Sequence, residues 1–300
     1  MSETPATPPA SDAAPANTTG PRSPATGSTT AARWGRRVPM ASAILLILTQ
    51  IAYPLTSGTA LDQVTIAVVL LSAATALTHA TVTRGVRYAA GVLVIISGLG
   101  LSSEILGVAT GLPYGCYEYE LGPLGPALAE VPLLIPLAWT GGLYPVWMVA
   151  CLVTERAGGV PARIGLTVAG ALGWDLFLDP QMVAEDRWSW CDTDSGLPGL
   201  PEIPLTNYLG WLVVALCMAL LLTVWDRAAP PPSGRPPRTD HTVPVLVFLW
   251  TWLGSALAHL AFLGLPVSAG YGFVGMGVLG VPLLVTAARR WRAKRAGTHR

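Results

Sequence analysis

Apolar runs long enough to cross a lipid bilayer as helices recur along most of this chain. A helix needs about 20 residues to cross roughly 30 Å of hydrocarbon, and only 12% of the 300 residues are charged. Eight such runs lie near 39–56, 63–83, 88–109, 130–154, 161–183, 206–226, 243–264 and 268–288. The sequence therefore predicts an all-α fold, a polytopic membrane helix bundle of about eight transmembrane helices.

The basic residues gather on one side of these runs. With the N-terminus placed in the cytoplasm, the cytoplasmic segments hold every one of the 18 Lys and Arg residues except Arg187. Cytoplasmic loops are enriched in Lys and Arg, so the chain is predicted to lie in the cell membrane with both termini cytoplasmic. Most acidic residues fall on the outer side, which indicates a site at the outer interface. The scattered basic residues and the net charge of +1 give no basis for nucleic-acid binding.

Composition divides the chain into three regions. Residues 1–32 are almost entirely Ala, Pro, Ser, Thr and Gly. Such a segment has too little apolar surface to offset the entropy of ordering, so a disordered tail is expected. Residues 33–290 are predicted to form the transmembrane domain, with an extended Pro-rich linker at 230–237, and residues 291–300 a basic cytoplasmic tail.

A polar insertion follows the third apolar run. Glu104 lies near the outer end of that run, where a carboxylate costs free energy and usually faces a bundle interior or a polar cavity. Residues 111–126, GLPYGCYEYELGPLGP, hold four Gly and three Pro, too many for a regular helix. We predict a loop that lines a cavity beside Glu104. The alternative is that Glu104 bonds a neighbouring helix and serves packing alone.

A second insertion, residues 173–190, carries Asp175 and Asp179. The spacing of four residues places both carboxyl groups on one face of a helix. Two carboxylates held close together repel as anions, so one of them tends to keep its proton near neutral pH and becomes a usable general acid. The alternative is that Asp179, followed by Pro180, marks the end of the helix.

Aromatic side chains surround both insertions. The candidates for substrate binding are Tyr114, Tyr117, Tyr119, Trp139, Trp188 and Trp190. Aromatic rings commonly form a belt at the membrane interface, and their faces also stabilise cations. The sequence leaves both roles open.

Histidines and cysteines carry weaker signals. His79 and His259 are lone histidines on apolar runs and are expected to be hydrogen-bonded packing residues, with His259 a minor catalytic candidate because it lies at about the depth of Glu104. The four cysteines show no metal-binding spacing, so no metal site is predicted. Cys116 and Cys191 both lie in predicted outer loops, where they either form a disulfide or remain free.

Taken together, GLPYGCYEY after Glu104, then WDLFLDP, WSW and PLTNYLGW, resemble the membrane carotenoid biosynthesis family that includes bisanhydrobacterioruberin hydratase and carotenoid 1,2-hydratases. The resemblance covers roughly residues 40–290, and its last motif adds Asn207 to the substrate-binding candidates. It implies hydration of the terminal carbon–carbon double bond of an acyclic, long-chain carotenoid without a cofactor. It leaves open which carotenoid reacts and the oligomeric state.

The residues agree with this chemistry. Alkene hydration needs an acid, an environment that tolerates a tertiary carbocation and a positioned water. We therefore assign the catalytic roles to Glu104, Asp175 and Asp179, which we expect to converge in an outer cavity between the third and fifth helices. One carboxyl group would protonate the alkene and another would orient the water.

Two other functions fit parts of the pattern. The Asp175-x-x-x-Asp179 motif is weakly similar to the diphosphate-binding aspartates of membrane prenyltransferases, which also require magnesium and basic residues. Carboxylates in broken helices are also typical of proton-coupled transporters, whose sites usually lie near the midplane between inverted repeats. No repeat is visible in this sequence.

Overall fold

The structure, a computed structural model, describes residues 1–2, 27–155, 159–230 and 241–297. Most of the tail predicted for residues 1–32 and most of the linker predicted for residues 230–237 lie outside the described residues.

The described chain is a bundle of eight helical rods, which confirms the all-α class. Two of the rods contain a π-helical stretch, η2 or η3, between two α-helices, and the first continues into a short 3₁₀ turn, η1. The rods are α1 (Gly27–Ala52) with η1 (Tyr53–Leu55), α2 (Thr59–Arg84), α3 (Val86–Leu93) with η2 (Val94–Gly98) and α4 (Leu99–Thr110), α5 (Ile135–Thr154), α6 (Gly159–Ala184), α7 (Leu205–Ala228), α8 (Thr242–Leu249) with η3 (Trp250–Gly254) and α9 (Ser255–Ala261), and α10 (Pro266–Gly297).

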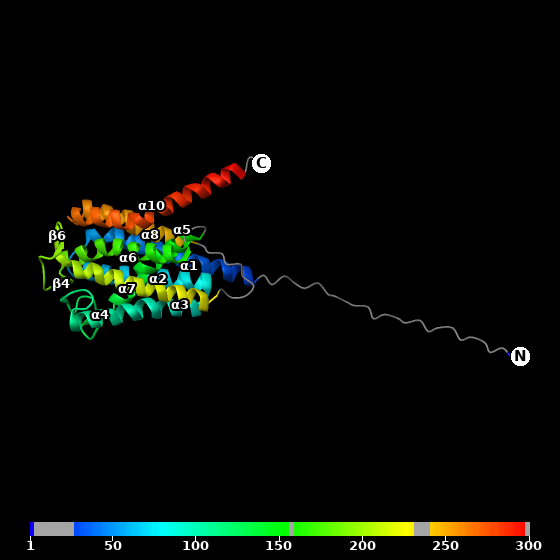
Figure 1. The fold of residues 1–300 in the computed structure, drawn as a ribbon, viewed down its shortest axis with the longest axis horizontal. Coiled ribbons are helices and arrows are strands. Elements are labelled where there is room, and N and C mark those ends of the chain that lie inside the picture. The colour runs from blue at the N-terminus through cyan, green and yellow to red at the C-terminus, as the bar shows by residue number, and fades with distance from the viewer. Residues whose placement is uncertain (3–26, 156–158, 231–240, 298–300) are drawn as a thin grey trace.

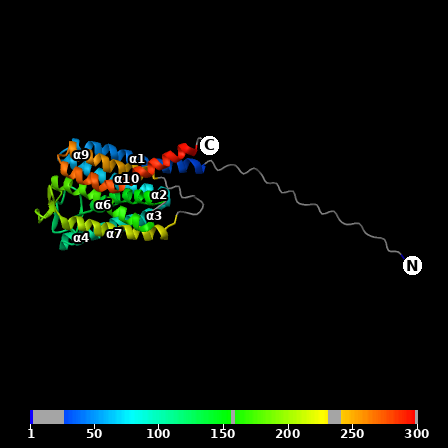
Figure 2. The ribbon, with the colours of Figure 1, turned by 45° about the horizontal axis from the view of Figure 1, so that its top comes forward.

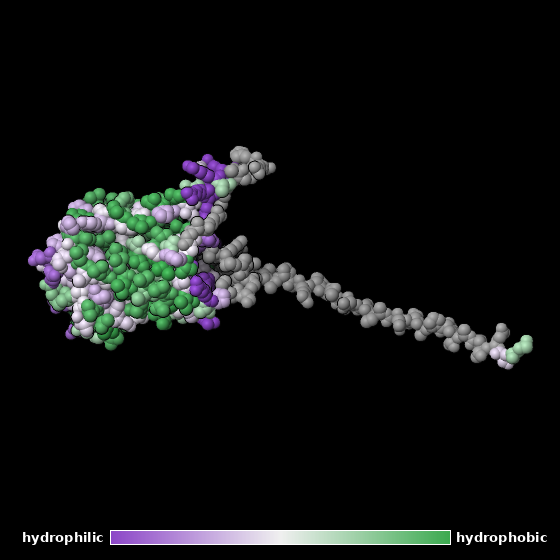
Figure 3. Space-filling view, in the orientation of Figure 1, coloured by the Kyte–Doolittle hydropathy of each residue, from purple (hydrophilic) through white to green (hydrophobic). Residues whose placement is uncertain are grey.

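Seven of these rods are long and apolar enough to cross a membrane. Within the described ranges, α6 is the rod that does not meet this measure, and it carries Arg163, Asp175 and Asp179. On the face drawn in Figure 3, a broad apolar band lies between two hydrophilic ends of the bundle. The chain is a multi-pass membrane protein.

Small residues let the rods pack closely, both around α5, the most buried of the membrane-crossing helices, and between α6 and α10. A Cβ atom on Gly141 of α5 would lie 2.1 Å from the Ser72 hydroxyl oxygen of α2. One on Gly173 of α6 would lie 2.3 Å from the backbone nitrogen of Met276 in α10. Glycine at these two crossings therefore allows backbones to approach at the distance that membrane helix packing favours.

Short strands form a cap at one end of the bundle (Figure 1). They form three antiparallel pairs: β1 (Tyr117–Tyr119) with β4 (Trp188–Trp190), β2 (Ala127–Leu128) with β3 (Val131–Pro132), and β5 (Gly196–Leu197) with β6 (Leu200–Pro204). The sequence predicted a Gly/Pro-rich loop at residues 111–126, and the structure shows turns there with one short strand, β1, whose pairing satisfies backbone groups that Gly and Pro keep out of a helix. The helix predicted from about residue 130 begins at Ile135.

A disulfide between Cys116 and Cys191 lies beside the β1–β4 ribbon, with a Cα–Cα distance of 5.4 Å. The backbone N–H of Cys191 also donates to the carbonyl oxygen of Cys116 at 2.9 Å. The sequence left this pairing open. The start of α1 and the end of α10 lie at the opposite end of the bundle from the cap (Figures 1 and 2).

Candidate active site

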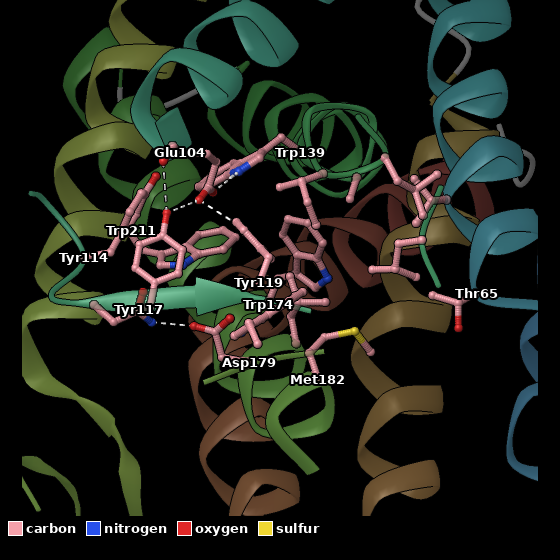
Figure 4. A pocket seen from close by; sticks show the side chains of 18 of the residues that line it. Thr65, Glu104, Tyr114, Tyr117, Tyr119, Trp139, Trp174, Asp179, Met182 and Trp211 are labelled. Carbon is pink, nitrogen blue, oxygen red and sulfur yellow. Dashed lines mark hydrogen bonds between the residues drawn. The ribbon is translucent and has the colours of Figure 1, made fainter. Parts of the chain in front are cut away.

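A cavity lies inside the bundle beneath the cap (Figure 4). It holds about 660 Å³ of empty space, its open mouth included. Helices α2, α4, α5, α6 and α7 and strands β1 and β4 all contribute to its wall. Its aliphatic lining consists mainly of Val69, Leu124, Leu134, Ile135, Leu178 and Met182. The cavity therefore offers a mostly apolar chamber with a few polar groups, which is the usual character of a small-molecule site.

Glu104 lies in this wall, and three hydrogen-bond donors converge on its carboxyl group. The hydroxyl groups of Tyr117 and Tyr119 donate to Oε2 at 2.6 Å and 2.8 Å. The indole Nε1 of Trp139 donates to Oε1 at 2.9 Å. Only 6% of Glu104 is exposed. A group surrounded by donors is suited to act as an acceptor, so this arrangement fits a buried carboxylate anion.

The phenol groups of the cap act as donors. Burial raises the pKa of the Tyr114, Tyr117 and Tyr119 hydroxyl groups, and the nearby negative charge of Glu104 raises each pKa further. These hydroxyl groups therefore keep their protons at neutral pH. Tyr114 shares a hydrogen bond of 2.9 Å with the Ser103 hydroxyl group, one residue before Glu104.

The two aspartates meet an amide from α7. The side-chain Nδ2 of Asn207 donates to Asp179 Oδ2 in a short hydrogen bond, and it lies 3.4 Å from Asp175 Oδ2. Both aspartates are buried, but only Asp179 lines the cavity. Asp175 lies behind it, and its Oδ1 atom has no hydrogen-bond partner among the described residues. The structure thus brings Glu104, Asp179 and Asn207 to one cavity, with Asp175 adjacent.

Pro180 does not end the helix, because α6 continues to Ala184. Proline has no N–H to donate to the carbonyl group four residues earlier, which is that of Leu176. The Ser268 hydroxyl group of α10 donates to this carbonyl oxygen at 2.8 Å. His259 Nδ1 lies 2.9 Å from the same hydroxyl group. His259 therefore holds the serine that donates to the carbonyl group left without a partner by Pro180. It does not line the cavity, so its position fits a packing residue.

The six predicted aromatic candidates all line the cavity. The rings of Tyr117 and Tyr119 lie edge-to-face at 5.5 Å, and Tyr119 meets Trp188 in the same way at 5.5 Å. Only 2% of Tyr114 and 2% of Trp139 are exposed. An interfacial belt is therefore the wrong description of these side chains, because they face the interior of the bundle.

Two further tryptophans, Trp174 and Trp211, complete the wall, and neither was among the residues predicted from the sequence. Trp211 stacks on Trp139 with ring centroids 3.9 Å apart, and Trp174 lies edge-on to Trp211 at 5.5 Å. Trp174 directly precedes Asp175, and Trp211 follows Asn207 by four residues on α7. That helical spacing was a signal that could have placed Trp211 on the same face as Asn207.

A polar network joins the cap-side ends of α1, α2 and α6 beside the cavity. Arg187, 5% exposed, pairs with Asp62 at 2.7 Å and with Glu185 at 3.8 Å. The Tyr53 hydroxyl group donates to Glu185 at 2.5 Å. Burial raises the pKa of the Glu185 carboxyl group, and the hydrogen bond from Tyr53 opposes this shift. Arg187, the one basic residue predicted outside, is therefore a buried partner in an ion pair.

One protein family matches most of this chain in sequence. The profile of a family described as "Carotenoid biosynthesis protein" matches residues 64–279. The chain belongs to this family. The matched residues include every residue of the cavity wall, from Thr65 to Trp211. The resemblance inferred from the motifs is thereby confirmed.

One relative has a specific name. The chain is 32% identical over 146 residues to the bisanhydrobacterioruberin hydratase of Haloarcula japonica, a match that spans 47% of this chain and 47% of the hydratase. No solved structure matches this chain.

Proposed function

We propose that this carotenoid biosynthesis protein is a hydratase that adds water to the terminal carbon–carbon double bond of an acyclic carotenoid end group. Family membership and the name of the relative from Haloarcula japonica support the pathway and the reaction. The observation that carries the proposal is that two buried carboxyl groups, Glu104 and Asp179, line one cavity whose other walls are mostly aromatic and aliphatic.

The aspartate pair supplies the acid. Asp175 and Asp179 lie one helical turn apart and share the Asn207 amide group, and two such carboxyl groups favour holding one proton between them. Asp179 touches the cavity, so it transfers this proton to the less substituted carbon of the terminal double bond. The positive charge then develops on the more substituted carbon, which forms a tertiary carbocation.

Water completes the addition. Glu104, held as an anion by three donors, attracts the cation and orients a water molecule toward it. The water oxygen forms a bond to the cationic carbon, and the proton that it loses returns to the aspartate pair. The carotenoid gains one water as a tertiary alcohol, and the enzyme ends in the state in which it began, so no cofactor is consumed.

The cavity argues against the prenyltransferase alternative. A diphosphate needs basic side chains or magnesium, yet none of the described residues that line the cavity is Lys or Arg. The position of the cavity also suits a carotenoid. A rigid polyene is about as long as a bilayer is thick, so its end group would lie beneath the cap while its chain lies among the helices.

Expression in a host that makes acyclic carotenoids tests the proposal. We expect pigments heavier by one water, identified by mass, when the parent chain is present. Glu104→Gln and Asp179→Asn should each lower product per amount of inserted protein by about 10²- to 10⁴-fold, because a general acid or base typically contributes that much. A transporter would leave the pigment masses unchanged.

Glu118→Gln is the matched control. Glu118 lies on β1 between Tyr117 and Tyr119, but its side chain is exposed and does not line the cavity. Its variant should retain parent activity. Parent-like activity in both Glu104→Gln and Asp179→Asn would show that the carboxyl groups are structural and that the proton comes from another source.

A further inference from the structure

Three indole rings from three different helices meet at one part of the cavity wall. Trp139 of α5 stacks on Trp211 of α7, and Trp174 of α6 lies edge-on to both, at 6.5 Å from Trp139 and 5.5 Å from Trp211. All three line the cavity beside Glu104 (Figure 4). We name Trp139, Trp174 and Trp211 the indole triad.

We infer that the indole triad is a binding site for a positively charged, branched hydrocarbon end group. The inference rests on the proposed function, in which such a cation forms in the cavity. A tertiary carbocation has no N–H or O–H group, so hydrogen bonds cannot hold it. The negative faces of aromatic rings can, and among the aromatic side chains tryptophan binds cations best.

Glycines on α4 and α5 make room for two rings of the triad, Trp139 and Trp174. A Cβ atom on Gly100 of α4 would lie 2.9 Å from the Trp139 ring, and one on Gly142 of α5 would lie 2.2 Å from the Trp174 ring. Real Cβ atoms do not approach other atoms so closely. Any residue other than glycine at positions 100 and 142 would therefore collide with these indole rings. The rings are therefore fixed before a ligand arrives, which lowers the entropy cost of binding.

Glu104 increases the attraction of the triad for a cation. Its Oε1 atom accepts the Trp139 indole N–H at 2.9 Å, and a hydrogen bond to an anion draws electron density into the donor ring. The same carboxylate also contributes its own charge, in an apolar cavity where charges are screened less than in bulk water. Three donors hold this carboxylate in place, so its charge acts on the cation from a fixed position.

Two probes of equal shape test the site. One is an isoprenoid chain that ends in a trimethylammonium group, and the other is the same chain ending in a neutral tert-butyl group. Binding to the purified full-length protein is measured in detergent. The parent should bind the ammonium probe about 30-fold more tightly than the neutral probe, as a desolvated cation–π site predicts.

Variants assign the preference to the rings. Trp211→Leu and Trp174→Leu should each reduce the preference for the ammonium probe from about 30-fold to a few-fold. Both variants should still bind the neutral probe, which would show that the cavity is intact. Trp211→Phe, which keeps a weaker π face, should retain an intermediate preference. Trp250→Leu is the matched control, because Trp250 lies on η3, bonds Gln50 at 3.0 Å and does not line the cavity.

The outcomes separate this inference from the proposed function. If the parent prefers the ammonium probe but hydrates no carotenoid, the cation site stands and the hydratase proposal fails. If the parent hydrates carotenoids but both Trp→Leu variants keep the full ammonium preference, the indole triad is not the cation site. If a Leu variant fails to insert into the membrane, Trp211→Phe provides the test. An ammonium preference and a turnover equal to those of the parent in Trp211→Phe would also contradict the inference.

Discussion

A single amide group organises the acidic side of the cavity at the scale of residues. Asn207 reaches from α7 to both Asp175 and Asp179 of α6. An amide N–H₂ group has two donors and no charge, so it can bond two carboxyl groups without neutralising either one. It thereby fixes the position of Asp179 against the cavity while leaving the pair able to hold and release a proton.

We expect Asn207→Leu to lower hydration by about 10- to 100-fold, because a hydrogen bond to a charged group contributes about 1.5–3 kcal/mol. Product mass per inserted protein measures the loss. Gln50→Leu removes an amide group of α1 that bonds Trp250 outside the cavity, and it should leave turnover unchanged. Equal turnover in Asn207→Leu and the parent would show that the aspartates hold their positions without the amide.

At the scale of elements, the β1–β4 ribbon forms the roof of the cavity. Successive side chains of a strand point to opposite faces, so Tyr117 and Tyr119 line the cavity while Glu118, between them, is exposed. Trp188 and Trp190 do the same on β4. The ribbon therefore delivers four aromatic rings to one side of a two-stranded sheet. Two strands alone are marginally stable, so the ribbon needs the support of the helices and of the disulfide.

Removing the disulfide should loosen this roof. The bond between Cys116 and Cys191 closes a segment of 75 residues, and a native disulfide typically stabilises by about 2–4 kcal/mol. We expect Cys116→Ser with Cys191→Ser to lower the melting temperature and to reduce hydration in detergent-solubilised protein. Cys217→Ser removes an exposed free thiol and serves as the control. An unchanged melting temperature and unchanged turnover would mean that helix packing alone holds the ribbon.

The whole molecule has two chemically different ends. The cap and the cavity lie at one end, and the start of α1 and the end of α10 lie at the other (Figure 1). Arg187 lies at the cap end, but its charge is matched by Asp62 at 2.7 Å. A buried, paired arginine does not hold a loop in the cytoplasm as an exposed one does, so Arg187 does not contradict a cap on the outer side.

Labelling with a membrane-impermeant thiol reagent tests this orientation. In a chain whose free cysteines, Cys151 and Cys217, are replaced by Ser, we expect Ser57→Cys and Leu121→Cys to react in intact cells. Arg300→Cys should react only after the membrane is permeabilised, because the distribution of basic residues predicts a cytoplasmic location for that end. The reverse pattern would invert the predicted topology.

Properties that depend on residues close together in the chain could be predicted from the sequence. Apolar runs of sufficient length predicted the number and approximate positions of the helices, because a bilayer leaves few alternatives to a helix for such a run. Glu104, Asp175 and Asp179 were recognisable because charge is costly in these segments. The motifs around them were specific enough to indicate the family, and the match of the family profile to residues 64–279 confirmed it.

How those segments face one another could not be predicted in this way, because it depends on packing between helices. In a membrane bundle the lipid-facing and inward-facing sides of a helix are both apolar, so the pattern of apolar residues does not reveal which side lies inside. For this reason the sequence left the Cys116–Cys191 pairing open, ended α6 too early in one interpretation and missed Trp174 and Trp211. Each of these depends on the rotation and distance of segments far apart in the chain, which packing between helices fixes and local composition does not record.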